Sequence, residues 1–136
     1  MLTIQDRIEI TETLALHAYI FDGNQLDRLE ELFTSDAIYD MTFTGLGAFE
    51  GIDTIRAAAA QMSASGHAPL AHFVTNIIAA SSGENEATVQ SKGLMIMADG
   101  SVHAVTHQDK LRRESGTWHI SRRVITPTPM PATHFA

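Results

Sequence analysis

The stretch SGHAPLAHFVTN, residues 65–76, marks the point at which the chain changes from helical to strand-like patterning. Its Ser-Gly pair ends a helical pattern, and the residues after Pro69 have the composition typical of a strand. Alternate side chains of a strand share one face, so we expect His72, Val74 and Asn76 to lie on the same face. A histidine and an asparagine on an apolar strand need polar partners, which the rest of the chain must supply.

Helical patterns precede this point and strand patterns follow it. Periodic apolar residues predict helices over residues 3–21, 26–34 and 52–65, with one strand over residues 37–43 between them. Four more strands are predicted over residues 71–80, 87–97, 102–113 and 117–126, and glycine-containing turns separate them. Helices followed by strands indicate an α+β fold, in which a curved antiparallel sheet wraps over the first and third helices.

Length and composition indicate one compact domain. The chain has 136 residues, 44% of them hydrophobic and 18% charged, which is typical of a globular protein. We expect a single domain over residues 1–126 and a proline-rich tail over residues 127–136. Prolines at three alternate positions of this tail rule out regular strand pairing there.

Charge and cysteine content exclude several classes of function. Sixteen acidic residues outnumber nine basic ones, and the net charge of -7 argues against a nucleic acid partner. The chain contains no cysteine, which excludes disulfides, thiolate metal sites and cysteine nucleophiles. No apolar run approaches the length that crosses a membrane, so we expect a cytoplasmic protein without a membrane partner.

The first predicted helix carries two candidate inward faces. Thr3 and Asp6 have the spacing of a helix-capping pair at its start. One stripe ends in a carboxylate and consists of Ile4, Ile8, Thr11, Ala15, Ala18 and Asp22. A neighbouring stripe has the character of a packing surface and consists of Ile10, Leu14, His17 and Phe21. We expect His17 to be a core or rim histidine.

Four segments in a fixed order give the chain its resemblance to a known family. They are AYIFDGNQLDRLEELFTSDAIYD, FEGIDTIRA, HFVTN and DKLRRESGTWHISRR. The chain resembles the SnoaL-like branch of the nuclear transport factor 2-like superfamily, which includes scytalone dehydratase and hexachlorocyclohexane dehydrochlorinase. The resemblance implies a cone of helices packed in a curved mixed or antiparallel sheet, with an apolar pocket inside.

The resemblance also implies a catalytic pair, Asp22 at the end of the first helix and His72 on a strand. In this branch the aspartate holds the histidine, and the histidine removes a proton. The chemistry is sound on general grounds, because a neutral imidazole is a competent base near neutral pH. A carboxylate that accepts the other ring N–H fixes the tautomer and stabilises the imidazolium that forms.

Five further residues are candidates for substrate binding. Tyr19 lies near the end of the first helix and Tyr39 on the first strand, so either hydroxyl is a candidate donor to a substrate oxygen. Met41 and Met97 fall near the positions of a substrate-side tyrosine and a second histidine in scytalone dehydratase, and this departure argues against scytalone itself as substrate. Asn76 is either a polar anchor of its strand or a substrate donor.

His107 is the last candidate for substrate binding. It shares one strand face with four other residues, namely His103, Val105, Asp109 and Leu111. Residues four apart on a strand stand roughly 13 Å apart, too far to share an ion, so we expect no metal site. No phosphate-binding loop or dinucleotide-binding pattern is present in the sequence, and we expect no cofactor.

The sequence therefore predicts a cofactor-independent lyase, dehydratase-like, that acts on a small apolar organic molecule through His72 and Asp22. One alternative is an isomerase of the ketosteroid isomerase type, in which Asp109 or Asp40 removes the proton. Another is a small-ligand-binding module without catalysis.

The outer face of the sheet predicts assembly. If the pocket lies on the concave side, the apolar residues on the outer side need cover, and they are Phe73, Thr75, Ile77 and Ala79. The three helices are committed to the inner side. We therefore expect a homodimer or homotrimer that covers this face with a second copy of the chain.

Overall fold

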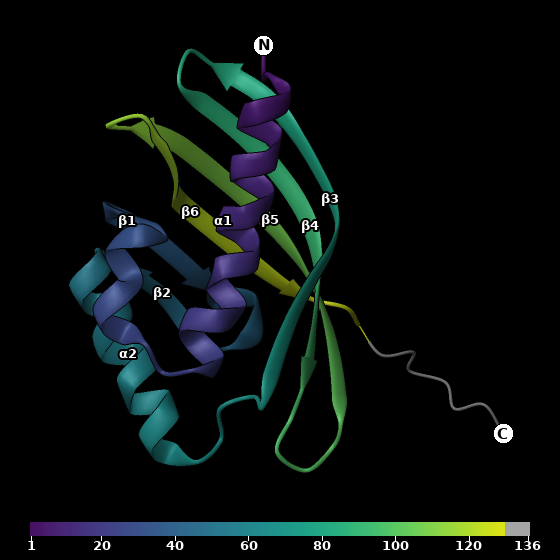
Figure 1. The fold of residues 1–136 in the computed structure, drawn as a ribbon. Coiled ribbons are helices and arrows are strands. Elements are labelled where there is room, and N and C mark those ends of the chain that lie inside the picture. Colours follow the sequence, from purple (N-terminus) through teal and green to yellow (C-terminus); the bar gives the residue numbers. More distant parts are fainter. Residues whose placement is uncertain (130–136) are drawn as a thin grey trace, which may run out of the picture.

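A computed structural model describes residues 1–129 of the chain (Figure 1). Its helices are α1 (Ile4–Asp22), η1 (Leu26–Glu31), η2 (Thr42–Thr44) and α2 (Ile52–Ser65). Its strands are β1 (Phe33–Met41), β2 (Gly47–Glu50), β3 (Ala71–Gly83), β4 (Glu86–Ile96), β5 (Val102–Glu114) and β6 (Thr117–Pro127). The predicted α+β fold is confirmed.

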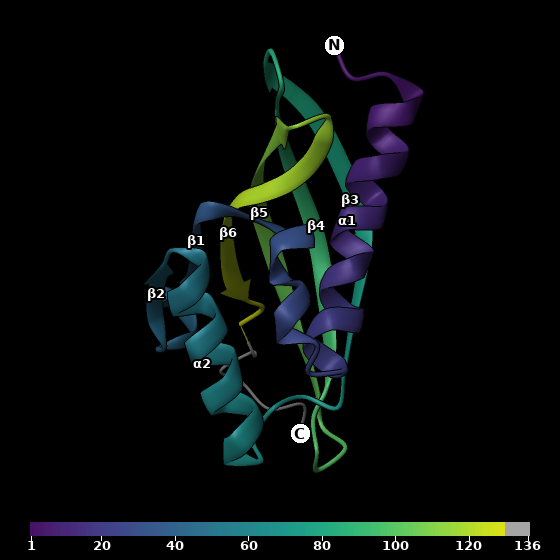
Figure 2. The same ribbon diagram turned by 60° about the vertical axis from the view of Figure 1, so that its left-hand side comes forward.

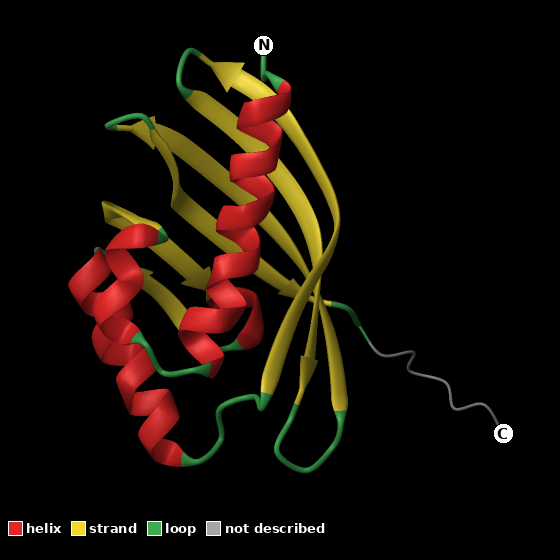
Figure 3. Cartoon of the chain, in the orientation of Figure 1, coloured by secondary structure: helices red, strands yellow, loops and turns green. Residues whose placement is uncertain are grey.

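The six strands form one curved, mixed sheet in the order β2-β1-β6-β5-β4-β3. Neighbouring strands are antiparallel except for β1 and β6, which run parallel. Helix α1 packs against β3 and β6, and α2 packs against β1, so both helices lie on the concave side (Figures 2 and 3). The concave side of the sheet also carries a cavity, which residues of α1, α2 and the strands line.

Helix α1 begins at the predicted capping pair. The side chain of Thr3 accepts from the backbone N–H of Asp6, and the Asp6 carboxylate accepts from the backbone N–H of Thr3. The inward face of α1 is the second of the two predicted stripes, because Ile4 and Ile8 are exposed. The buried positions of α1 are Asp6, Ile10, Leu14, His17 and Ile20.

The segment after α1 differs from the sequence prediction. The predicted second helix is a short 3-10 helix, and β1 already begins at Phe33. Strand β1 ends at Met41, and Phe43 falls in η2 with an exposed side chain. No strand was predicted over the following residues, but Gly47 begins the short strand β2, which pairs with β1. A strand of four residues is too short to produce a clear alternating pattern.

A bulge in β3 changes which residues face inward. The pairing of β3 with β4 shifts between Thr75 and Ile78, and Asn76 adopts a left-handed backbone conformation with φ of 54°. Asparagine tolerates this conformation better than most residues. Beyond the bulge the faces exchange, so Ile77 and Ala79 pack against the core and Ile78 is exposed. The expectation that Ile77 and Ala79 lie on the outer face was wrong.

The far end of β6 also departs from the prediction. Pro127 pairs with Val105 of β5, and the N–H of Thr128 donates to the carbonyl of Ala104 at 2.9 Å. Proline is tolerated there because it is the terminal residue of the strand and the following residue supplies the hydrogen bond. The rest of the predicted tail, from residue 130, lies outside the described residues.

Candidate functional site

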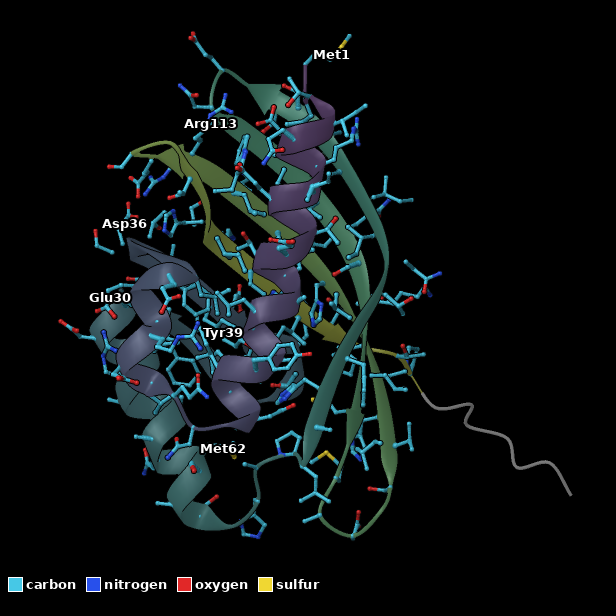
Figure 4. The ribbon with its side chains drawn as sticks, in the orientation of Figure 1. Met1, Glu30, Asp36, Tyr39, Met62 and Arg113 are labelled. Carbon is cyan, nitrogen blue, oxygen red and sulfur yellow. The ribbon has the colours of Figure 1, made fainter. Side chains whose placement is uncertain are left out.

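A cavity of about 380 Å³ lies between α1, α2 and the concave face of the sheet. Its wall is mostly apolar, and the polar side chains that reach it are His17, Tyr39, Thr44, Gln61, His72, His107 and Arg123. Figure 4 shows Tyr39 near the middle of the fold and Met62 on α2, and both residues line the cavity. The volume and the apolar wall are those of a site for a small organic molecule.

Asp22 is the last residue of α1, and a tight helix end sets its position. The N–H of Gly23 donates to the carbonyl of Tyr19 at 3.0 Å. A Cβ at Gly23 would lie 2.9 Å from this carbonyl oxygen, so the turn requires glycine. A carboxylate at a helix C-terminus opposes the helix dipole, and the last turn of α1 contains no basic residue. The position of Asp22 is therefore not explained by helix stability.

The carboxylate of Asp22 holds His72 through two contacts. The backbone N–H of His72 donates to Oδ2 at 3.0 Å, and the ring Nδ1 lies 2.5 Å from Oδ1. An ionised carboxylate only accepts hydrogen bonds, so Nδ1 is the donor in this contact, and Nε2 is the nitrogen that has the lone pair in the neutral form of the ring. His72 lines the cavity and Asp22 does not, which leaves the Nε2 edge of the ring facing the cavity.

His17 and Tyr39 form a second polar contact in the wall. His17 Nε2 and the Tyr39 hydroxyl are 2.8 Å apart, and the His17 ring stacks on Phe21 with centroids 4.2 Å apart. Burial holds the pKa of His17 well below its usual value, so this imidazole is neutral. Burial raises the pKa of Tyr39 to about 12, which keeps its hydroxyl protonated. The edge of the His17 ring meets His72, with centroids 5.5 Å apart.

A fully buried ion pair lies next to this contact. Arg123 of β6 donates to both carboxylate oxygens of its cross-strand neighbour Asp109, at 2.8 and 2.9 Å. Burial alone would lower the pKa of Arg123, but the Asp109 carboxylate raises it, so the guanidinium stays charged. Arg123 reaches the cavity while Asp109 lies behind it. The Arg123–Asp109 ion pair therefore has no net charge.

His107 of β5 is the third histidine of the wall. Its Nδ1 lies 3.1 Å from the hydroxyl oxygen of Ser91 on β4. Burial lowers the pKa of His107 to about 2, with smaller contributions from Arg123 and His72, so the ring is neutral at physiological pH. The predicted strand face that carries His107 is the concave one, because Val105, His107 and Asp109 are all buried.

The structure brings some of the predicted site residues together and separates others. His72, Tyr39, Met41 and His107 line the cavity, and Asp22 contacts His72. The remaining three candidates, Tyr19, Asn76 and Met97, are absent from the wall.

Each of these three residues has a local reason for its position. Tyr19 is on the outer face of α1 with 73% of its surface exposed. Asn76 is exposed at the β3 bulge. Met97 follows the end of β4 and forms a turn with Ser101, whereas Met95, which pairs with His72, lines the cavity.

Four residues of the site were not predicted from the sequence. Arg123, Ser91 and Gly93 were not candidates, and His17 was assigned to core or rim packing. The available signal was the pair Arg122 and Arg123 across the predicted β5–β6 turn from Asp109, because an antiparallel hairpin pairs residues on either side of its turn. Counting from the turn selects Arg122, and the register shift between Lys110 and Leu111 makes Arg123 the partner instead. Nothing in the pattern indicated Ser91, and Gly93 indicated only a bulge or a close approach by some other group.

The described cavity wall contains no acidic residue, since none of the residues that line it is Asp or Glu. Within residues 1–129, no three side chains of His, Cys, Asp and Glu are grouped as ligands for a metal ion. The same part of the chain has no helix long and apolar enough to cross a membrane. The chemistry that these residues offer directly is that of imidazoles: burial keeps His17 and His107 neutral, and His72 is paired with the carboxylate of Asp22.

The sequence profile of the SnoaL-like domain family matches residues 2–124, and the chain therefore belongs to this family. This confirms the resemblance inferred from the four sequence segments. No curated protein matched.

Solved structures of similar proteins share the fold over nearly the whole chain. A nuclear transport factor 2-like protein with a cystatin-like fold from Novosphingobium aromaticivorans is 22% identical, covers 95% of this chain and 86% of its own, and has a TM-score of 0.76. A protein of the same organism, provisionally assigned as a scytalone dehydratase, is 19% identical. The match covers 98% of this chain and 91% of that protein, with a TM-score of 0.79. LinA is 20% identical, and the match covers 98% of this chain and 95% of LinA, with a TM-score of 0.78. At these identities the likeness establishes the nuclear transport factor 2-like fold.

Proposed function

We propose that this SnoaL-like domain is a cofactor-independent lyase that removes a carbon-bound proton from a small, mostly apolar organic molecule. His72 is the base and Asp22 orients it. The observation that carries the proposal is the double contact of Asp22 with the ring and backbone N–H groups of His72, at the wall of an apolar cavity. This contact leaves the lone pair of Nε2 available to a bound molecule.

The surroundings of His72 suit a base. When Nε2 takes a proton, the ring becomes a cation, and the adjacent carboxylate of Asp22 stabilises it. The two neighbouring imidazoles, His17 and His107, are kept neutral by burial and so do not already carry positive charge. The apolar wall excludes water, which strengthens the interaction between Asp22 and the imidazolium.

Elimination is the reaction that we favour. His72 Nε2 forms a bond to the proton, and the electron pair of the broken C–H bond becomes the new C=C bond. The leaving group departs from the neighbouring carbon with the electrons of its own bond. A hydroxide leaving group takes up the proton that His72 removed and is released as water, which returns His72 to its neutral form.

The isomerase alternative with a carboxylate base receives less support. Asp109 has both oxygens occupied by Arg123, and neither Asp109 nor Asp40 is among the residues that line the cavity. The Asp40 carboxylate accepts from the backbone N–H of Thr42 and from Arg122 instead. An isomerisation that uses His72 as its base remains consistent with the site and differs only in the fate of the proton.

Deuterium exchange tests the proposal without knowledge of the natural substrate. The probe is α-tetralone, a bicyclic ketone without charge, incubated with the protein in heavy water. We expect the wild-type protein to accelerate deuterium uptake at the carbon next to the carbonyl. His72→Ala and Asp22→Asn should each lower this rate by at least about a hundredfold, the usual contribution of a general base.

The matched control is Tyr19→Phe, which changes an exposed residue of the same helix away from the cavity and should leave the exchange rate unchanged. Thermal unfolding of each variant establishes that the fold is retained. Full exchange by either dyad variant would remove His72 and Asp22 from the mechanism. Exchange by the wild-type protein no faster than in buffer would instead indicate a binding module without this chemistry.

A further inference from the structure

We propose that His107, held by Ser91 above the bare backbone of Gly93, is the hydrogen-bond donor that recognises an oxygen atom of an uncharged substrate. This inference rests on the proposed function for the orientation of the substrate relative to His72. The recognition itself is independent of any proton transfer. The residue that determines specificity is therefore distinct from the base.

Gly93 provides the space in which the His107 ring lies. A Cβ at Gly93 would be 2.6 Å from Cε1 and 2.9 Å from Nε2 of His107, closer than real side-chain contacts. The edge of the imidazole thus occupies the place that a side chain at residue 93 would take on the concave face. Gly93 pairs with Val74, two residues beyond His72 on β3. We call the group of Gly93, Ser91 and His107 the His107 seat. Gly93 and Ser91 lie on β4, the strand next to the one that carries the proposed base.

Ser91 determines which nitrogen of His107 carries the proton. Ser91 is 2% exposed, and among the described residues the only hydrogen-bond partner of its hydroxyl is His107 Nδ1. A buried hydroxyl needs an acceptor for its proton, so Ser91 donates and Nδ1 accepts. Nδ1 then has no proton, and Nε2–H is a donor on the edge of the ring that lies over Gly93 in the cavity wall.

The charges of the wall favour an uncharged ligand. Arg123 is the one cationic side chain that lines the described cavity, and Asp109 neutralises it through two hydrogen bonds. His107 itself is neutral, as the low pKa caused by its burial indicates. An anion would enter without a counter-charge and would also be repelled by Asp22 behind His72. The N–H of a neutral imidazole suits a carbonyl oxygen.

A carbonyl at His107 would also serve the proton removal at His72. A carbon next to a carbonyl is acidified, because the electron pair left by the proton moves onto the oxygen. A donor at that oxygen stabilises the negative charge as it develops. The proposed substrate is therefore an uncharged, mostly apolar ketone, with its oxygen at His107 Nε2–H and its acidic carbon at His72 Nε2.

Three probes of similar shape test this recognition by titration calorimetry. They are α-tetralone, the hydrocarbon tetralin, which lacks the oxygen, and the anion naphthoate. We expect the wild-type protein to bind α-tetralone about three- to tenfold more tightly than tetralin, the usual effect of one hydrogen bond. Naphthoate should bind more weakly than the ketone.

Variants at the seat separate the donor from the cavity. His107→Phe keeps a ring above Gly93 but removes the donor, so the affinity for tetralin should persist and the preference for the ketone should vanish. Gly93→Ala forces the imidazole to move and should also abolish the preference. Tyr19→Phe is the control and should retain it. In the wild-type protein, nitrogen NMR should show the His107 Nε2–H signal shifting with α-tetralone and unchanged with tetralin.

The outcomes distinguish this inference from the proposed function. His72→Ala should lose deuterium exchange but keep the preference for the ketone, because the base does not bind the oxygen. A preference for the ketone without any exchange would overturn the proposed function and support the role of His107. Equal binding of ketone and hydrocarbon by the wild-type protein, an unchanged preference in His107→Phe, or tight binding of naphthoate would overturn the inference.

Discussion

Two buried neutral histidines should make the stability of this protein fall as the pH falls. Burial lowers the pKa of His17 well below the usual histidine value of 6.5, and it lowers the pKa of His107 to about 2. In the unfolded chain both groups regain ordinary pKa values. At pH values between the folded-state pKa and the unfolded-state pKa of each histidine, the unfolded state binds more protons than the folded state. The free energy of unfolding therefore increases with pH in this range. The contribution of these two histidines to the free energy of unfolding is complete above about pH 7 and is lost progressively as the pH falls below that value.

The size of the effect follows from proton linkage. One histidine that stays neutral in the folded state costs about 1.4 kcal/mol per pH unit below its unfolded pKa. Between about pH 7 and pH 5 each histidine therefore removes about 2 kcal/mol, and the two together remove about 4 kcal/mol. This is a large part of the free energy of unfolding of a typical folded domain, which is about 5–15 kcal/mol.

Urea unfolding at several pH values between about 7.5 and 4.5 measures this slope. The range lies above the pH interval in which Asp6 contributes, because the backbone hydrogen bond from Thr3 lowers the pKa of Asp6 from 3.8 to about 2 and its effect on stability falls mainly between these two values. His17→Phe and His107→Phe should each remove half of the slope, and the exposed control His103→Gln should remove none. A free energy of unfolding that does not change with pH, or full slopes in both phenylalanine variants, would refute the neutral state of these histidines.

Three further predictions concern the scaffold. Gly23→Ala should lower the deuterium exchange rate, because its Cβ would lie 2.9 Å from a helix carbonyl and displace Asp22; an unchanged rate would contradict the need for glycine there. Asp109→Ala should lower the free energy of unfolding by about 3–5 kcal/mol in urea, since it leaves Arg123 buried and unpaired, and Asp109→Ala with Arg123→Met should recover part of this loss. We also expect a homo-oligomer, a dimer or trimer, that covers the exposed outer residues of β3 such as Phe73. Light scattering should report a mass above that of one 14.8 kDa chain, and a monomer would contradict this expectation.

The sequence pattern predicted the elements of the fold well wherever the periodic segments were long. Helix α1, helix α2 and strands β3 to β6 lie close to the predicted ranges, because each has a sustained apolar period or clear turn residues at its ends. Strand β2 and the early start of β1 were missed. These segments are short, and their extended conformation depends on pairing with distant strands rather than on local pattern.

The site could be predicted only in part. The approach of Asp22 to His72 connects residues that are 50 positions apart, so it was implied by family resemblance and became visible only in the structure. The bulge at Asn76 moved that residue out of the cavity, and no rule of alternation predicts a bulge. A second bulge, on the β5–β6 hairpin, gives Asp109 the partner Arg123 instead of its neighbour Arg122, which simple counting from the turn would select.

The seat of His107 illustrates what sequence cannot reveal. A glycine inside a strand indicates a bulge or a close approach, but it does not name the group that approaches. Here that group is an imidazole from the neighbouring strand, two positions further along the pairing register. Only the three-dimensional packing shows that Gly93, Ser91 and His107 act as one unit.

The proposed role of His72 requires that Asp22 fix the tautomer of its ring, with the proton on Nδ1 and the lone pair on Nε2. Nitrogen NMR of the isotope-labelled protein at neutral pH measures this directly, because protonated and unprotonated ring nitrogens have well separated chemical shifts. We expect a protonated Nδ1 and an unprotonated Nε2 in the wild-type protein, and loss of this single tautomer in Asp22→Asn. A neutral ring with its proton on Nε2 would contradict the role of His72 as the base.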